Sequence, residues 1–172
     1  MRIELPDPCR VVLIGAAGSG KSTFARRLFR PTEILSSDAF RAMVADDEAD
    51  QSATSAAFSL LHAVARQRIA RGRMTVVDAT NVERRARRPL ITLARRFEIP
   101  PVAIVFDLPP DVTRAWNAGR AERVVPADVI ERHRRDLRHA LGGLADEGFA
   151  RVWVLDTVAA VDAAEIVRRP RA

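Results

Sequence analysis

Short apolar runs alternate along the chain with longer stretches in which apolar residues recur at helical spacing. The short runs predict buried strands, at residues 10–14, 32–37, 74–79, 101–108 and 151–156. The longer stretches predict helices, at residues 21–30, 38–44, 57–72, 83–97, 110–118, 127–141 and 160–169. Because strands that alternate with helices form a parallel sheet covered on both faces, the pattern predicts one α/β domain over residues 1–172. Its centre would be a five-stranded parallel sheet sandwiched by helices.

The most basic stretches lie in two of these predicted helices. Residues 83–88 and 131–139 are expected to be solvated helix faces, since charge runs of this kind usually face water. His133 falls on the apolar stripe of its helix and is expected to pack there rather than to act as a catalyst. Pro89 is expected to break its helix or to mark its start, because proline removes a backbone donor.

The composition indicates the charge of the expected partner and the expected cellular compartment. The net charge of +6 favours an anionic partner such as a nucleotide, a nucleic acid or a lipid surface. All but one of the 28 basic residues are arginine, however, and such a bias can equally reflect codon usage. Cys9 is the single cysteine, which excludes an intrachain disulfide and favours a reducing cytosol. No apolar run approaches membrane-spanning length, so we expect a cytoplasmic protein without a membrane partner.

Residues 15–23 read GAAGSGKST and match the phosphate-loop pattern G-x-x-x-x-G-K-[ST] between a predicted strand and a predicted helix. Lys21 is the only lysine of the chain, and its compact charge fits a tight loop in which a guanidinium would not. Lys21 would bridge the β- and γ-phosphates, and the Ser22 hydroxyl would ligate Mg²⁺. The expected cofactors are therefore ATP or another NTP with Mg²⁺. The loop residues that would hold them are Gly15, Gly18, Ser19, Gly20, Lys21, Ser22 and Thr23.

Two acidic residues follow the second and third predicted strands. Asp38 is expected to accept the proton of an attacking hydroxyl, and Arg41, on the same helix face, to hold an anionic feature of the acceptor. The alternative is that Asp38 or Ser37 simply caps the helix. Asp78 ends the third strand, where it could hold a water on Mg²⁺ or merely terminate the strand.

Residues 114–126 lie where P-loop kinases carry a lid. Arg120 and Arg123 are three residues apart, so both could reach the triphosphate and offset charge in the transition state. Arg123 is accordingly a candidate catalytic residue, together with Lys21, Asp38 and Arg41. The alternative is a solvated arginine face. The fold expected is thus a P-loop kinase-like sheet with an arginine-bearing lid.

Beyond these motifs, the chain resembles, nearly end to end, the N-terminal kinase domain of bacterial polynucleotide kinase-phosphatase, an RNA-repair enzyme. The segments that carry the resemblance are VVLIGAAGSGKSTFA, SSDAFR, DDEADQ, TVVDATNV, ARRPLI and the arginine lid through EGFARVWVL. The resemblance implies a P-loop phosphotransferase that moves the γ-phosphate of an NTP to a 5′-OH polynucleotide end with Mg²⁺. RNA would be the preferred acceptor, with DNA as a further one. Phosphatase and ligase domains, fused or associated, would be its partners.

The same resemblance assigns roles by position. Lys21 and Ser22 become phosphate and metal ligands, Asp38 the general base on the 5′-OH, and Arg41 a substrate-side arginine. Arg120 and Arg123 become lid arginines on the nucleotide. The chain departs from the family where Trp116 stands before Asn117 in place of an arginine. Arg114 is two residues away, nearly on the opposite helix face, and is a poor substitute.

Two other functions fit the same residues. A small-metabolite kinase would also use an aspartate and an arginine beside the phosphate loop to hold a compact anionic acceptor. A non-catalytic, NTP-dependent nucleic-acid-binding module would bind both ligands without transferring phosphate, as the missing lid arginine allows.

Overall fold

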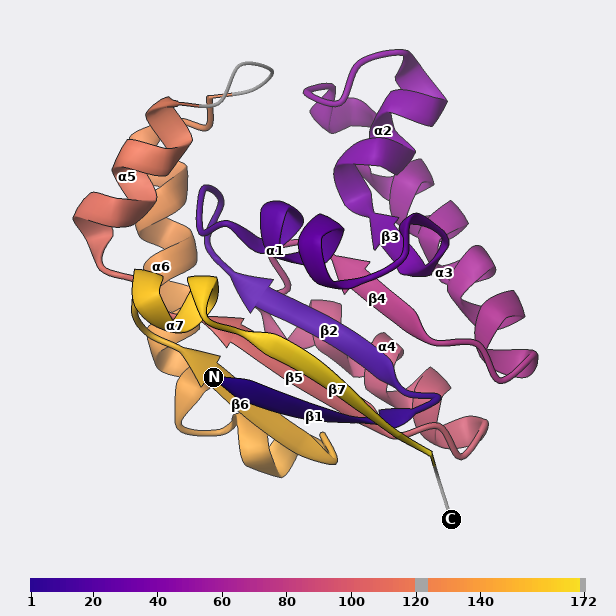
Figure 1. Cartoon of the computed structure of the whole chain (residues 1–172). Coiled ribbons are helices and arrows are strands. Elements are labelled where there is room, and N and C mark those ends of the chain that lie inside the picture. The colour runs from indigo at the N-terminus through magenta and orange to yellow at the C-terminus, as the bar shows by residue number, and fades with distance from the viewer. Residues whose placement is uncertain (120–123, 171–172) are drawn as a thin grey trace.

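Five parallel strands form the central sheet of the protein, in the order β3-β4-β2-β5-β6 (Figure 1). The computed structural model describes residues 1–119 and 124–170. The strands are β2 (Arg10–Gly15), β3 (Ile34–Ser36), β4 (Thr75–Asp78), β5 (Pro101–Phe106) and β6 (Arg151–Leu155). Each of them was expected from an apolar run, and the predicted five-stranded α/β fold is confirmed.

Helices cover both faces of this sheet. They are α1 (Lys21–Leu28), α2 (Ser37–Ala45), α3 (Thr54–Ala70), α4 (Arg84–Arg96), α5 (Pro110–Ala118), α6 (Ala127–Leu141) and α7 (Val158–Asp162). Short 3₁₀ turns occur at η1 (Pro31–Glu33), η2 (Gln51–Ala53) and η3 (Leu144–Glu147). None of the helices within the described ranges is long and apolar enough to cross a membrane.

The central strand β2 explains why the sheet needs two covers. Its residues are fully buried, and alternate side chains enter different cores because the strand period is two. Val11 and Leu13 pack with α1, α7 and the N-terminal strand, whereas Val12 and Ile14 pack with α3, α4 and α6. A strand buried on both sides reads in the sequence as an unbroken apolar run.

The predicted closing helix at residues 160–169 is wrong. Helix α7 ends at Asp162, and the chain continues as strand β7 (Glu165–Pro170). Strand β7 pairs in parallel with β1 (Arg2–Asp7), which the sequence analysis did not predict, and the two form a separate sheet. The partner of each strand lies at the other end of the chain, so local spacing carries no sign of the pairing.

Helix α4 also differs from expectation, in two respects. It runs without interruption through Pro89, which lies on its exposed side, so the expected break or start at Pro89 is wrong. In addition, Arg87 is not part of a solvated face, because it is only 1% exposed. Arg87 is three and four residues before the buried Leu90 and Ile91, which places it on the side of the helix that faces the sheet.

The Arg87 guanidinium forms a buried ion pair with Glu147 of η3. Its Nε atom donates to Glu147 Oε2 at 2.8 Å, and one Nη atom donates to the other carboxylate oxygen. A second Nη atom donates to the Asn81 carbonyl oxygen at 2.8 Å. Both charged groups are shielded from water and hydrogen-bonded to each other. Removal of one of them would therefore leave the other as a buried charge without compensation.

Replacing Arg87 by alanine is expected to lower the free energy of unfolding by about 3–5 kcal/mol, as for other broken buried ion pairs. Chemical denaturation would measure the change. Arg85→Ala is the matched control, since its pair with Glu83 is exposed and is expected to contribute little to stability. Equal effects of the two replacements would show that burial of the Arg87 pair does not matter for stability.

Cys9 gives a second test of the core. Burial is the main reason that the pKa of its thiol is raised, to about 12, and the nearby Asp7 carboxylate acts in the same direction. The thiolate is the reactive form, so the native protein is expected to react with a thiol reagent at pH 8 at least about 100-fold more slowly than the unfolded chain. Rapid labelling of the native protein would contradict this placement of Cys9.

Candidate active site

The candidate site lies at one edge of the central sheet, where the parallel strands end together. Strand β2 ends at Gly15 and leads into the phosphate loop, and β3 ends at Ser36 and leads into α2 (Figure 1). Ser36 is opposite Asp78 in the β3–β4 register. The three segments that the sequence marked as chemical are therefore neighbours, as expected for a ligand crevice at the carboxyl ends of parallel strands.

The backbone of the phosphate loop is curled by two glycines. Gly18 and Gly20 have φ values of 76° and 81°, a left-handed conformation that other residues adopt only with strain. Side chains of α5 press on the loop at the same points. A Cβ atom added at Gly18 would lie 2.8 Å from Asn117 Cβ, and one added at Gly20 would lie 2.7 Å from Trp116 Cζ3.

Lys21 is held inside this loop and is only 7% exposed. Its ammonium group donates to the Gly15 carbonyl oxygen at 2.9 Å, to the Ala16 carbonyl oxygen at 2.6 Å and to Ser19 Oγ at 3.2 Å. Ser22 and Thr23 follow in the first turn of α1, whose backbone N–H groups have no partner within the helix. A buried cation beside unpaired N–H groups fits the phosphates of a nucleotide, and the partly exposed Ser22 hydroxyl is available to a metal ion.

Asp78 is buried at the end of β4, and the residues after it are tied to the start of the phosphate loop. The Gly15 N–H donates to the Thr80 carbonyl oxygen at 2.9 Å. Asn81, in a left-handed conformation with φ 48°, donates from Nδ2 to the Leu13 carbonyl oxygen at 2.8 Å. These bonds continue the β2–β4 pairing beyond the sheet and so fix Asp78 relative to the loop.

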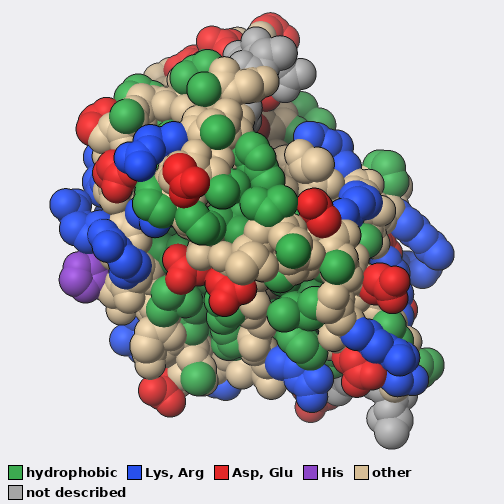
Figure 2. Space-filling view, turned by 60° about the vertical axis from the view of Figure 1, so that its left-hand side comes forward, with side chains coloured by type: hydrophobic (Ala, Val, Ile, Leu, Met, Phe, Trp, Pro, Cys, Tyr) green, Lys and Arg blue, Asp and Glu red, His purple; other side chains and the backbone are tan. Residues whose placement is uncertain are grey.

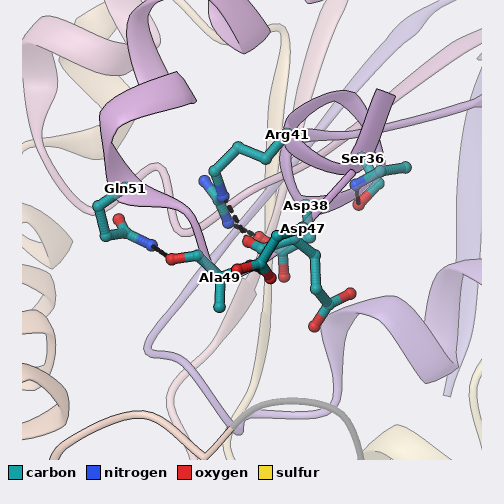
Figure 3. A network of polar contacts seen from close by, with 8 residues as sticks. Ser36, Asp38, Arg41, Asp47, Ala49 and Gln51 are labelled. Atoms are coloured by element: carbon teal, nitrogen blue, oxygen red, sulfur yellow. Dashed lines mark hydrogen bonds and ion pairs between the residues drawn. The ribbon is translucent and has the colours of Figure 1, made fainter. Parts of the chain in front are cut away.

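Asp38 and Arg41 face one another at the start of α2 (Figure 3). Ser36 caps this helix by accepting from the Ala39 N–H at 3.4 Å, so the alternative that Ser37 or Asp38 is the cap is wrong. The Asp38 carboxylate forms an ion pair with the buried Arg41 guanidinium. Arg41 Nε also donates to the Glu48 carbonyl oxygen at 2.8 Å, which anchors the acidic loop that follows α2.

This acidic loop, residues 46–50, is ordered by its own carboxylates. Asp47 accepts from the Ala49 N–H at 2.8 Å, and the Gln51 side chain donates to the Ala49 carbonyl oxygen at 3.1 Å (Figure 3). Asp50 accepts from the Ser52 hydroxyl at 2.6 Å, and this bond is the main reason that the pKa of Asp50 is lowered. The loop therefore places negative charge beside the Asp38–Arg41 pair.

The predicted lid is described only in part. Arg120 and Arg123 lie outside the described residues. On either side of them, Asn117 donates from Nδ2 to the Val125 carbonyl oxygen at 2.9 Å and accepts from the Val125 N–H at 3.0 Å. Val125 packs in turn against Ala16 of the phosphate loop. Arg114 is exposed and lies 3.4 Å from Glu131 of α6, so it does not take the place of the absent family arginine.

His133 is half-buried in α6, in agreement with the expected packing. It also lies close to the phosphate loop, which the sequence did not indicate. It is three residues after Ile130, which packs against Ala16, and four before the buried Leu137. Its Nδ1 atom is buried without a hydrogen-bond partner in the described part of the chain. Burial is the main reason that the pKa of His133 is lowered, and the positive charge of Lys21 adds to the effect.

Asn81 and Asn117 are functional residues that sequence reasoning missed. Both are buried, and both hold backbone groups that border the phosphate loop. Asn117 follows the buried Thr113 by four residues, so polar residues at helical spacing were a signal of a buried polar face in α5. Asn81 gave no comparable signal, because the carbonyl group that it holds lies 68 positions away.

Solved structures share this arrangement at low sequence identity. A chain of the Pnkp1/Rnl/Hen1 RNA repair complex gives a TM-score of 0.67 at 24% identity, over 80% of this chain and 46% of that one. A chain of the AvrRxo1-ORF1:-ORF2 complex with ATP gives 0.69 at 16%, over 88% and 55%. A gluconokinase from Sinorhizobium meliloti 1021 gives 0.55 at 18%, over 90% and 85%. The chain thus spans about half the length of the first two structures, and these similarities show a common fold.

The family comparison covers most of the site. No curated protein matches the sequence. A family model described as AAA domain, AAA_33, matches residues 11–143 and so includes the phosphate loop, Asp38, Arg41 and Asp78. With more than half of its length matched and the fold of the P-loop kinases, the chain belongs to the AAA domain family AAA_33.

Proposed function

We propose that the protein is a 5′-OH polynucleotide kinase, which transfers the γ-phosphate of ATP or another NTP to the 5′-OH end of RNA, with DNA as a further acceptor. The observation that carries the proposal is the Asp38–Arg41 pair, which lies at the same sheet edge as the Lys21 phosphate loop. Support comes from the SSDAFR, DDEADQ and VVDATNV segments and from the fold shared with a chain of an RNA repair complex. Fused or associated phosphatase and ligase domains would then complete the repair of an RNA end.

The phosphate loop would bind the donor. Its backbone N–H groups and Lys21 hold the β- and γ-phosphates, and the lysine exchanges its bonds to the loop carbonyl groups for bonds to phosphate oxygens. Ser22, together with a water held by Asp78, would ligate Mg²⁺. When bound, the ion would supply charge neutralisation at the triphosphate. Arg120 and Arg123 are proposed to neutralise the remaining charge from the lid.

The start of α2 would activate the acceptor. Asp38 accepts the proton of the 5′-OH while that oxygen forms a bond to the γ-phosphorus and the bond from this phosphorus to the β–γ bridging oxygen breaks. Arg41 orients the Asp38 carboxylate through their ion pair. The same guanidinium can contact a phosphate of the acceptor.

A small-molecule kinase is the second candidate, favoured by the acidic loop. The carboxylate of Asp47 lies beside Asp38 and Arg41 (Figure 3), and it would repel a densely phosphorylated strand at short range. The gluconokinase with the same fold shows that this architecture also serves compact acceptors. Salt-sensitive turnover of oligonucleotides, without turnover of metabolites, would separate the two. A protein that binds NTP and oligonucleotide but transfers nothing would be the non-catalytic module.

The first test follows the label from γ-labelled ATP to a 5′-OH RNA oligonucleotide in the presence of Mg²⁺. Asp38→Asn is expected to lower kcat by about 10²- to 10⁴-fold, the usual contribution of a general base, and to leave ATP affinity unchanged. Lys21→Ala is expected to abolish transfer and to weaken ATP binding. Asp111→Asn, which changes another exposed acid in the first turn of a helix, is the control and should retain activity.

The proposal fails if the wild-type protein binds ATP and leaves the RNA unlabelled at saturating oligonucleotide. It fails in part if label transfer persists in Asp38→Asn, because the acceptor would then be activated by another residue. Calorimetry on each variant separates loss of ATP binding from loss of transfer.

A second test concerns the metal. Chelation of divalent ions is expected to abolish transfer, and restoring Mg²⁺ to return it. Ser22→Ala removes the proposed ligand, so half-maximal activity should require at least about tenfold more Mg²⁺, with a smaller increase for Asp78→Asn. Titration of activity with Mg²⁺ at fixed ATP measures both. Wild-type Mg²⁺ dependence in Ser22→Ala would contradict the assignment of Ser22.

A further inference from the structure

Helices α3 and α4 lie side by side on one face of the sheet, and neither contains an acidic residue. Ile69 of α3 packs against Ala94 of α4, which fixes the two helices as neighbours. Their combined length is 30 residues, for which the average of the chain, 22 acids in 172 residues, would give about four. A bias toward arginine adds cations, but it does not by itself remove acids, so this face is charged more selectively than the rest of the protein.

The outer surface of the two helices, called here the α3–α4 face, carries Arg85, which pairs with Glu83, and also exposed arginines at Arg66, Arg71, Arg84, Arg88 and Arg96. None of the five has an acidic partner within the described part of the chain. Arginines elsewhere do pair, as in Arg114–Glu131 of α5 and α6 and Arg169–Glu4 of the small sheet. On the α5 side of the molecule, acidic and basic side chains are interspersed (Figure 2).

The α3–α4 face begins beside the candidate site. Helix α4 follows β4, whose last residue is Asp78, and precedes the parallel strand β5, so it runs from the catalytic edge back along the sheet. Arg84 and Arg88 therefore lie near the site, and Arg96 lies at the far end, about 18 Å away along the helix. Arginine in the first turn of a helix opposes the helix dipole, so stability does not account for Arg84 at this position.

We propose that the α3–α4 face binds the sugar–phosphate backbone of the acceptor polynucleotide, downstream of its 5′ end. The inference rests on the proposed function and names the surface that it would use. A row of unneutralised arginines is complementary to the phosphates that follow one another along a nucleic-acid strand. Guanidinium groups can hold phosphate oxygens in pairs, which orients the strand as well as attracting it.

The alternative polyanion, a lipid surface, fits the face less well. A membrane-binding helix inserts large apolar side chains beside its cations. The exposed positions of α4 carry arginine together with Pro89 and Thr92, with no large apolar side chain among them. The large apolar side chains that α3 exposes, Leu60 and Val64, precede Arg66 along that helix. The α3–α4 face would also hold the body of the strand away from the acidic loop, so that the 5′ end alone reaches Asp38.

The test compares two triple variants. Arg84→Gln, Arg88→Gln and Arg96→Gln together remove three charges from the α3–α4 face. Arg2→Gln, Arg26→Gln and Arg30→Gln remove three exposed charges from β1 and the α1 region, on the other side of the sheet. Far-UV circular dichroism and the thermal midpoint establish that both variants are folded.

Binding is measured by fluorescence anisotropy of a 20-nucleotide RNA that carries a 5′-phosphate and a 3′ label, without ATP, so that no turnover occurs. The α4 variant is expected to bind at least about tenfold more weakly at 50 mM salt. The slope of log K against log salt should become shallower by about 2, since each contact to a single strand contributes about 0.7. The control variant should keep both values, and a dinucleotide acceptor should be phosphorylated equally by all three proteins.

Two results would overturn the inference. One is wild-type RNA affinity and salt slope in the α4 variant. The other is loss of binding to anionic lipid vesicles in that variant while RNA binding is kept, which would assign the face to a membrane. Either result leaves the kinase assay, and so the proposed function, untouched. Conversely, if no oligonucleotide accepts phosphate but RNA binding still falls in the α4 variant alone, the face stands and the proposed function fails.

Discussion

The structure depends on the common direction of the five strands in the central sheet. Because all of them are parallel, every carboxyl end lies at one edge, and the segments that follow β2, β3 and β4 meet there. The phosphate loop, the Asp38–Arg41 pair and Asp78 come from separate stretches of sequence and become neighbours for this reason alone. Parallel strands also require long crossovers on both faces, and the two buried cores on either side of β2 follow from that requirement.

Two electrostatic environments adjoin this edge. Around Arg41, the acidic loop gathers carboxylates that its own backbone holds in place. On the α3–α4 face, Arg66, Arg71, Arg84, Arg88 and Arg96 have no acidic partner within the described part of the chain. A substrate that is negative over most of its length but neutral at its reacting end suits such a surface better than one that is uniformly charged. This separation of charge explains how the protein can be basic overall and yet acidic around Arg41.

Much of the fold and of the candidate site could be predicted from the sequence. The parts that could not be predicted have a physical cause in common. Continuous apolar runs predicted the five central strands, and the glycines with a following lysine predicted the phosphate loop. The Asp38–Arg41 contact follows from helical spacing. By contrast, β1, β7, Asn81 and the Arg87–Glu147 pair owe their places to partners 60 or more positions away. The local spacing of apolar residues indicates which side of a helix a residue lies on, and for Arg87 it indicated the buried side. It does not indicate which distant residue will be its partner.

The pairing of β1 with β7 has a consequence for the order in which the chain folds. During synthesis from the N-terminus, β1 emerges before the central strands, but its partner, residues 165–170, emerges after all of them. The central strands can assemble in the meantime, since their crossovers are short by comparison. Until β7 arrives, Ile3 and Leu5 have no strand beside them, although both end fully buried. The small sheet can therefore form only after all five central strands have been synthesised.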